Sequence, residues 1–351
     1  MSIKPRIQII DFLRGLSCLG ILLFHVRIDL WIGWIRITSY SDEYSAFDHL
    51  IKWLSVPAPF LGYSILLFFI ISGFCIHFPN QGIISNPNWK SYFLRRFFRI
   101  YPPYIIAIIF SAVISFVCSK LWLDSTWNLE RIFRVVTLSQ NYSPNNGQFL
   151  CNPSLWTIPL EIEFYLLYPL AFFIFSRLRS ISVLLLTLSL STVSVYLIEY
   201  GFAWISYTAL FFWPVWLLGA KVAEFYNRKI SIKTMSNIKI LLILITSLGV
   251  SLYSRYVFTE WWVQYVTWTF FYLVFFVYCV FNASKIHSMI GYKLFNVISW
   301  IGKISFSLYL IHYPLFKLIG YFHVEIFGSK PSNFLITLIY IFPVIFIAWL
   351  F

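Results

Sequence analysis

The chain has 351 residues, of which 60% are hydrophobic and 11% are charged, and its mean hydropathy is +0.79. A soluble domain carries about 25% charged residues and could not bury this much apolar surface, so the composition excludes a soluble globular protein. The net charge of +13 is spread between apolar stretches rather than gathered on one soluble face, which excludes a soluble nucleic-acid-binding protein.

Stretches of about 20 mostly apolar residues are long enough to cross a membrane as helices. In chain order they are 7–26, 61–79, 102–121, 155–175, 181–199, 203–223, 237–254, 262–282, 299–319 and 333–351. No soluble domain and no internal repeat stand out between them. The sequence therefore predicts an all-α fold, a polytopic membrane helix bundle of about ten transmembrane helices that forms one domain over residues 1–351.

The distribution of charge between these stretches predicts how the chain is oriented. Lys and Arg favour the cytoplasmic side of a membrane protein. Most bases fall on the inner side, and most acids outside, if the N-terminus is cytoplasmic. We therefore expect a multi-pass protein of the cell inner (cytoplasmic) membrane, with loops 27–60 and 122–154 outside. Cys118 and Cys151 flank the second loop, where an oxidising compartment would allow them to form a disulfide.

The first stretch carries two ionisable side chains, Arg14 and His25. A charge near the bilayer centre costs at least ~2.5–3.5 kcal/mol, so such residues are functional candidates. Eleven residues separate the two, which places them on one helix face roughly 16 Å apart. The alternative is that each side chain only reaches toward its nearer membrane interface.

The fourth stretch contains Glu161 and Glu163. With the orientation above, Glu161 is expected at a depth similar to that of His25, where a carboxylate would fix the imidazole tautomer and raise its basicity. The alternative is a structural glutamate bonded to a neighbouring helix. The two glutamates differ by about 200° around the helix, so one can face a site while the other pairs structurally.

Ser305, Tyr309 and His312 form one polar stripe on the ninth stretch, because they are spaced by four and three residues. If this helix runs from the inside to the outside, His312 also lies in the outer half. Such a stripe can belong to a site. It is equally compatible with a histidine that is hydrogen-bonded within the packed bundle.

A basic, aromatic segment precedes the third stretch and contains Arg95, Arg96 and Arg99. Arginine binds phosphate through paired hydrogen bonds, so this cluster is a candidate site for a phosphorylated donor. The alternative is an interfacial helix that binds anionic lipid. Ser72 and Gly73 lie in the inner third of the second stretch, where the glycine would let a ligand or a helix backbone approach closely.

Taken together, these residues resemble the acyltransferase-3 family of integral membrane acyltransferases, in its stand-alone, glycan O-acetyltransferase-like form. The resemblance covers almost the whole chain. It consists of a span-1 motif from Arg14 to His25 and four further motifs over Phe69–Phe74, Arg95–Pro102, Ser154–Tyr165 and Gly302–His312. Two positions depart from the family pattern: Ile162 stands where many members have a second acid, and Phe306 where tyrosine is usual.

The resemblance implies a function and a set of site residues. The enzyme would move an acyl group, acetyl by family usage, from cytoplasmic acyl-CoA to a hydroxyl of a surface polysaccharide, lipopolysaccharide or lipid-linked sugar. Acetyl-CoA or another acyl-CoA would be a co-substrate, and the enzyme would have no bound cofactor and no metal. Membrane lipids would surround the protein. The implied residues are His25 and Glu161 for catalysis; Arg14, Ser72, Gly73, Arg95, Arg96, Arg99 and Tyr101 for donor binding; and Trp156, Glu163, Ser305, Tyr309 and His312 as support.

Other functions stay open at this point. A flippase or transporter for a lipid-linked sugar also carries intramembrane charges, although it would be expected to show paired repeats. A non-catalytic scaffold of a glycan assembly complex is a third possibility. Within the enzyme hypothesis, Cys18 lies on the same face as His25 and could carry a covalent acyl group. Aromatic residues of the outer loops suit either sugar stacking or a membrane-interface belt.

Overall fold

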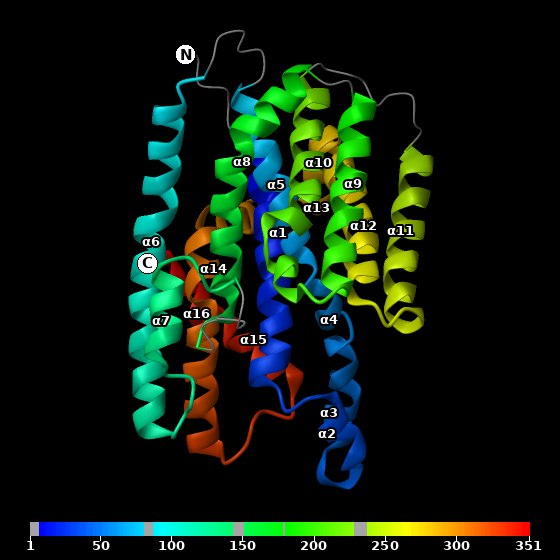
Figure 1. Ribbon diagram of the computed structural model, residues 1–351. Helices are drawn as coiled ribbons and strands as arrows, with labels where there is room; N and C mark the ends of the chain where they lie inside the picture. Colours follow the sequence, from blue (N-terminus) through cyan, green and yellow to red (C-terminus); the bar gives the residue numbers. More distant parts are fainter. Residues whose placement is uncertain (1–6, 81–86, 143–150, 178–179, 228–236) are drawn as a thin grey trace.

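The computed structural model describes residues 7–80, 87–142, 151–177, 180–227 and 237–351 (Figure 1). Within these residues the chain is helical and contains no strand, which confirms the all-α prediction. The helices are α1 Gln8–His25, α2 Trp34–Ser39, α3 Ala46–Ile51, α4 Ala58–Leu61, α5 Ser64–His77, α6 Trp89–Leu121, α7 Leu129–Val136, α8 Thr157–Arg177, α9 Ser180–Glu199, α10 Ala209–Asn227, α11 Asn237–Val257, α12 Trp261–Phe281, α13 Ala283–Ile290, α14 Tyr292–Phe327, α15 Phe334–Ile339 and α16 Ile341–Leu350.

Eight helical stretches of the described residues are long and apolar enough to cross a membrane, and they coincide with eight of the ten predicted spans. The predicted span 61–79 is instead α5, which follows Ala46–Leu61 after a 40° bend, so the bent pair gives a ninth span. The predicted span 333–351 is the shorter pair α15 and α16. The described residues thus give eight or nine spans rather than ten.

Helices α1 and α14 cross at the centre of the bundle, where two glycines bring their backbones together (Figure 1). A Cβ atom on Gly15 would lie 1.9 Å from the carbonyl oxygen of Ile298. A Cβ atom on Gly302 would lie 1.8 Å from the carbonyl oxygen of Asp11. Small residues allow such close contact between membrane helices, so this crossing fixes how α1 is placed against α14.

A second crossing joins α5 and α10 in the same way. A Cβ atom on Gly73 would lie 2.0 Å from the carbonyl oxygen of Trp216, and one on Gly219 would lie 2.0 Å from that of Ile70. Of the two explanations for Gly73, close approach of a helix backbone is therefore the one that the structure supports. Gly73 packs against α10 and is not part of a cavity wall.

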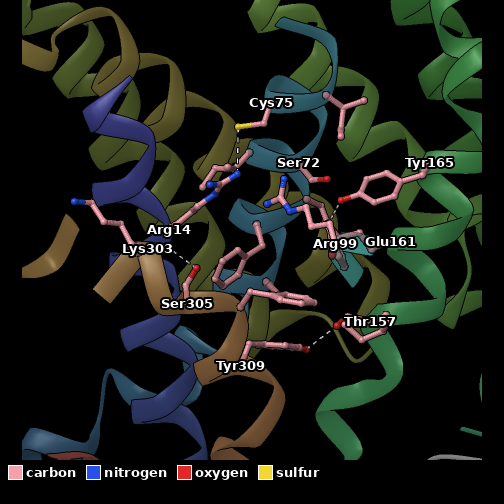
Figure 2. A pocket seen from close by; sticks show the side chains of 18 residues that line it. Arg14, Ser72, Cys75, Arg99, Thr157, Glu161, Tyr165, Lys303, Ser305 and Tyr309 are labelled. Carbon is pink, nitrogen blue, oxygen red and sulfur yellow. Dashed lines mark hydrogen bonds between the residues drawn. The ribbon is translucent and has the colours of Figure 1, made fainter. Parts of the chain in front are cut away.

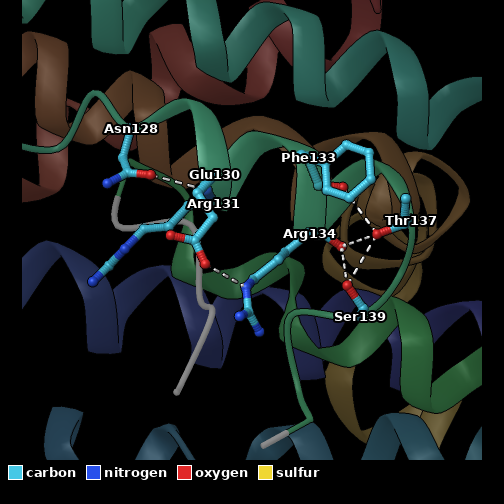
Figure 3. Close-up of polar contacts among 7 residues, drawn as sticks. All are labelled: Asn128, Glu130, Arg131, Phe133, Arg134, Thr137 and Ser139. Carbon is cyan, nitrogen blue, oxygen red and sulfur yellow. Dashed lines mark hydrogen bonds and ion pairs between the residues drawn. The ribbon is translucent and has the colours of Figure 1, made fainter. Parts of the chain in front are cut away.

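The described part of the segment after α6, residues 122–142, contains the helix α7 and folds back along the bundle, where the sequence predicted a loop. Asn128 caps α7, Glu130 pairs with Arg134 at 3.1 Å, and Thr137 and Ser139 close its end (Figure 3). The hydroxyl of Tyr104, halfway along α6, donates to the carbonyl of Val135 at 2.8 Å. The end of α7 therefore lies beside the middle of α6.

Buried amide side chains hold this returning segment in place. Asn152 donates to the carbonyl of Leu310 at 2.7 Å, and Asn141 donates to the carbonyls of Trp156 and Tyr207 at 2.7 and 2.8 Å. Irregular backbone is tolerated at membrane depth only where protein groups satisfy its hydrogen bonds. These amides meet that requirement and set the position at which α8 begins.

The cysteines flanking this segment do not form the disulfide considered from the sequence. Cys118 and Cys151 are both buried free thiols. The thiol of Cys151 donates to the carbonyl oxygen of Ser111 at 3.2 Å, so it is engaged with α6 in its reduced form.

Candidate functional site

Two cavities adjoin α1, at different levels along this helix. The first, which we call the Arg14 cavity, has a volume of about 130 Å³ and lies between α1, α5, α6, α8 and α14 (Figure 2). The second, the His25 cavity, has a volume of about 940 Å³ and opens around the C-terminal end of α1. Ile65 and Tyr309 line both cavities, so the two are neighbours separated by these side chains.

Arg14 reaches into the first cavity from α1 (Figure 2). Its Nη2 atom donates to the thiol of Cys75 at 3.4 Å, and its Nη1 atom lies 3.9 Å from the carboxylate of Asp11. The guanidinium is half-buried. A cation in this position can attract an anionic or strongly polar ligand group.

Glu161 lies on the opposite wall of the same cavity. Tyr165, one helical turn further along α8, donates its hydroxyl to this carboxylate. Arg99 of α6 interacts electrostatically with both residues and projects into the cavity (Figure 2). The carboxylate therefore orients a tyrosine and attracts an arginine, and this wall of the cavity is polar.

The arginine cluster divides between the cavity and the surface of α6. Arg99 lines the cavity, whereas the guanidinium of Arg96 lies over the rings of Tyr92 and Tyr165 at 5.6 and 5.5 Å. Arg95 is exposed and bonds to the neighbouring Ser91. The three arginines therefore do not form a single pocket, although all lie on the same end of α6.

Two other predicted donor-binding residues have different surroundings. Ser72 lines the Arg14 cavity and accepts a hydrogen bond from the indole of Trp216 at 3.3 Å. Tyr101 stacks on Phe97 and donates to the carbonyl of Val136 at 3.4 Å. Tyr101 thus anchors α7 against α6 and takes no part in the cavity wall.

Glu163 has a structural environment. Its carboxylate accepts hydrogen bonds from the hydroxyl of Tyr142 and, at 2.6 Å, from the backbone N–H of Ala209. Ala209 is the first residue of α10, so the carboxylate stabilises the positive end of that helix. Of the two glutamates separated by 200°, Glu161 faces a cavity and Glu163 pairs structurally, as the helical spacing allowed.

His25 lines the second cavity and faces an aspartate that the sequence analysis did not single out. Its Nδ1 atom lies 3.4 Å from the carboxylate of Asp29, one turn later in the π-helical segment Val26–Leu30. Its ring packs 5.1 Å from the ring of His312 and 5.0 Å from that of Tyr313. The four-residue spacing from His25 to Asp29 is the signal that could have identified this pair.

The predicted position of Glu161 beside His25 is wrong. Glu161 lines the Arg14 cavity, whereas the carboxylate facing His25 is Asp29. The reason is that the residues just before α8 already lie at the level of His25: Ser154 contacts His312, whose ring packs 5.1 Å from that of His25. Glu161 lies about two helical turns further along the chain, beside the other cavity. Counting residues from the expected outer loop therefore misplaced Glu161 in depth.

His312 is fully buried beside His25 and has partners for both ring nitrogens. Nδ1 lies 2.8 Å from the carbonyl oxygen of Tyr309, and Nε2 lies 3.3 Å from the hydroxyl of Ser154. A carbonyl oxygen only accepts, so Nδ1 carries a proton, and in the neutral ring Nε2 then accepts from the serine hydroxyl. His312 is therefore a neutral support for the ring of His25, and it does not line either cavity.

The remaining supporting residues join α14 to the start of α8. Tyr309 donates to the carbonyl of Ser154 at 2.8 Å and accepts from Thr157 at 3.0 Å. Ser305 lines the Arg14 cavity, and its hydroxyl donates to the carbonyl of Gly302 at 2.9 Å. The ring of Trp156, which lines the His25 cavity, is fixed by neighbouring aromatic rings.

The chemistry of the other candidate groups is limited. The thiol of Cys18 is fully buried and directed at the carbonyl of Ser305, 3.9 Å away, and it lines neither cavity. That position does not suit a covalent acyl carrier. Among the described residues, no group of three His, Cys, Asp or Glu side chains could hold a metal ion.

A family model for an acyltransferase domain matches residues 7–351. The chain belongs to the acyltransferase-3 family. Among curated members of this family, the O-acetyltransferase OatA of Staphylococcus aureus (strain NCTC 8325) is 24% identical over 92% of this chain and 52% of its own length. An uncharacterized protein of Haemophilus influenzae is 28% identical over 34% of this chain and 52% of its own length.

These comparisons define how far the similarity extends. The chain spans about half the length of the curated relatives that it matches. No solved structure matches it. Both cavities lie within residues 7–351, which the family model matches.

Proposed function

We propose that this acyltransferase-3 member is a membrane O-acyltransferase that moves an acyl group, acetyl in the simplest case, from acyl-CoA to a hydroxyl of a glycan. The acceptor would be a surface polysaccharide, a lipopolysaccharide or a lipid-linked sugar. The observation that carries this proposal is the pair of adjoining cavities, one with arginines and one with a histidine–aspartate pair. An enzyme that takes its donor from one face of the membrane and its acceptor from the other needs one binding site toward each face, and the two sites must adjoin.

The donor would use the Arg14 cavity. Its volume of about 130 Å³ is far below that of pockets that enclose ligands of drug size, so only the acyl end of coenzyme A would enter. Arg14 and Arg99 would polarise or anchor the pantetheine arm of coenzyme A, while its phosphates would stay near Arg95 and Arg96 on the end of α6. Glu161 would hold Arg99 and Tyr165 in place rather than act on His25.

The acceptor would use the His25 cavity. Asp29 favours the tautomer in which Nδ1 carries the proton, which leaves the Nε2 lone pair for the acceptor hydroxyl. The acceptor oxygen attacks the thioester carbonyl as Nε2 takes its proton, and the carbon–sulfur bond then breaks. The proton passes to the departing thiolate, while Asp29 stabilises the transient imidazolium.

The charge distribution supports one orientation for this reaction. Most bases fall in the segments on the same side as the N-terminus of α1, and this bias favours a cytoplasmic N-terminus in the inner membrane. The Arg14 cavity would then be accessible to cytoplasmic acyl-CoA. The His25 cavity would be accessible to a glycan on the outer side.

The O-acetyl content of the host's surface polysaccharide tests this function. A deletion strain is complemented with the wild-type chain or with His25→Ala. We expect acetate to disappear on deletion and to return only with the wild type, because loss of a general base costs about 10²–10⁴-fold in rate. Unchanged acetate in all three strains would contradict the proposal and favour a flippase for a lipid-linked sugar.

A further inference from the structure

The His25 cavity contains two arginine side chains that come from distant parts of the chain. Arg27 belongs to the π-helical segment after α1, and Arg255 lies in the last turn of α11. Both line the cavity together with His25. Their guanidinium groups are close enough to repel each other electrostatically. Two positively charged side chains therefore line the cavity that also contains the candidate base, His25.

Neither arginine is neutralised by a carboxylate. The chain has 13 aspartate and glutamate residues, and all of them lie in the described part of the structure. Within that part, no carboxylate forms an ion pair with Arg27 or Arg255, whereas Arg36 pairs with Glu43 at 2.8 Å. The Nε atom of Arg27 is also buried without a hydrogen-bond partner.

The contacts that these arginines do make leave their charges unneutralised, and the hydrogen bond of Arg255 is with the uncharged side chain of Tyr63. The guanidinium of Arg27 lies 5.8 Å from the ring centre of Trp31, and that of Arg255 lies 6.0 Å from that of Phe60. Ring faces attract cations but accept no conventional hydrogen bond from all five donors of a guanidinium. A pair of unneutralised guanidiniums in a cavity is suited to bind an anion through charge-assisted hydrogen bonds.

The rest of the cavity wall suits a sugar. Tyr63, Tyr207, Trp261 and Tyr265 contribute aromatic faces and hydroxyl groups. The volume of about 940 Å³ is within the range of pockets that enclose a whole small ligand. The cavity therefore combines an anion site, stacking surfaces and a base.

We propose that the His25 cavity binds an anionic glycan, whose phosphate or carboxylate group lies between Arg27 and Arg255. This contact would place a hydroxyl of the same or the next sugar against His25. The inference rests on the proposed function for the role of the cavity as the acceptor site. It adds the substrate class: the acceptor carries a negative charge close to the hydroxyl that is acylated.

A binding experiment with matched probes tests this inference without requiring acyl transfer. The full chain is placed in phosphatidylcholine nanodiscs, and the quenching of tryptophan fluorescence is titrated with hexyl glucoside, hexyl glucuronide and hexyl glucosyl phosphate. We expect at least one anionic probe to bind about tenfold or more tightly than the neutral probe, with an affinity that falls as salt is added. The carboxylate and phosphate probes distinguish the two sources of the charge.

Variants connect the anion preference to the two arginines. Arg27→Gln and Arg255→Gln should each weaken binding of the preferred anion by about tenfold or more, because each removes a charge-assisted hydrogen bond. Binding of the neutral glucoside should not change. Arg27→Lys and Arg255→Lys should keep part of the preference. Arg36→Gln is the matched control, because Arg36 is exposed and paired outside the cavity.

Two results would overturn the inference: equal affinity of the wild type for all three probes, or full anion preference in both glutamine variants. A glutamine variant can fail to fold, which its elution from a size-exclusion column and its melting temperature would reveal. In that case the anion preference of the wild type and of the lysine variants still tests the inference. Anion binding through the arginines without any change in polysaccharide acetate would retain this inference and reject the proposed acyl transfer.

Discussion

His25 and Asp29 form the contact on which the proposed chemistry depends, since the carboxylate lies 3.4 Å from Nδ1 and leaves the second ring nitrogen for the substrate. Replacing Asp29 with Asn removes the charge that supports the imidazolium. We expect kcat to fall about tenfold or more while KM for acyl-CoA stays the same, because Asp29 does not line the cavities. Steady-state kinetics of the purified chain measure this.

The conservative variant and an exposed control make the Asp29 prediction specific. Asp29→Glu should restore part of kcat, and Asp42→Asn, at an exposed position, should behave as the wild type. A fall in melting temperature that accounts for the lost activity of Asp29→Asn would instead assign the residue a purely structural role.

Glu161 is predicted to act on the donor side, because it accepts a hydrogen bond from Tyr165 and interacts electrostatically with Arg99. In Glu161→Gln, the position of Arg99 should loosen, which raises KM for acyl-CoA more than it lowers kcat. The same kinetics measure both quantities. A large fall in kcat with KM unchanged would contradict this assignment and favour the direct catalytic role that family resemblance implied.

At the residue scale, the sequence identified several side chains that line the cavities. It did not identify the residues that those side chains contact. Arg14, His25 and Glu161 stood out because ionisable groups are rare in apolar helices, and all three line cavities. Asp29 and Arg27 did not stand out, because they follow the apolar stretch and fall in the expected outer loop 27–60. The continuation of α1 as a π-helical segment brings them into the site.

At the scale of elements, the α1–α14 crossing is the contact that sets the geometry of both cavities. Gly15→Ala places a Cβ atom 1.9 Å from the carbonyl oxygen of Ile298, so the helices must move apart. Overpacking of this kind costs about 1–3 kcal/mol, and we expect a clear fall in the melting temperature of the purified chain.

Gly249→Ala is the matched control for this crossing. Gly249 lies within α11, and a Cβ atom there would meet nothing within 4 Å. Alanine favours a helix over glycine by up to about 1 kcal/mol, so the melting temperature should stay the same or rise. Equal stability of both alanine variants would show that the crossing is not tightly packed.

The connection between α6 and α7 provides a pH-dependent prediction. Asp124 lies 2.5 Å from the ammonium of Lys317 on α14 and accepts the backbone N–H of Thr126 at 2.9 Å. Burial alone would raise the pKa of Asp124, but these two partners outweigh it and lower the pKa below the ordinary value of 3.8. The stabilisation is therefore complete above about pH 4 and is lost as the pH falls through the lowered pKa.

Replacement of Asp124 with Asn isolates this contribution. The wild type should melt at a higher temperature than Asp124→Asn at pH 6, and the difference should shrink as the pH is lowered well below 3.8. Thermal unfolding across this pH range measures the effect. A difference that is independent of pH would show that the Asp124 charge does not stabilise the fold.

The sequence predicted the elements that are marked by long apolar stretches. It did not predict the segment that is held in place by amide side chains. Apolar runs identified the long helices, because the bilayer requires them. The returning segment before α8 is held by Asn141 and Asn152 through hydrogen bonds to backbone carbonyls, which leave no hydrophobic pattern in the sequence.

At the scale of the whole molecule, the central feature is the division of the site into two neighbouring cavities. Tyr309 and Ile65 stand between them, so an acyl group would need to pass these side chains to meet the acceptor. The polar stripe of α14 suggested a site near Tyr309 from sequence. The division itself depends on how α1, α5, α8 and α14 pack together, which no local pattern records.

Acyl transfer across a sealed membrane tests the central claim most directly. Inverted inner-membrane vesicles expose the cytoplasmic face and receive radiolabelled acetyl-CoA, which does not cross the membrane. The account predicts labelled acetate on glycan inside the vesicles with the wild type and none with His25→Ala. Label that appears only on glycan outside the vesicles, or equally with both chains, would contradict the two-cavity mechanism.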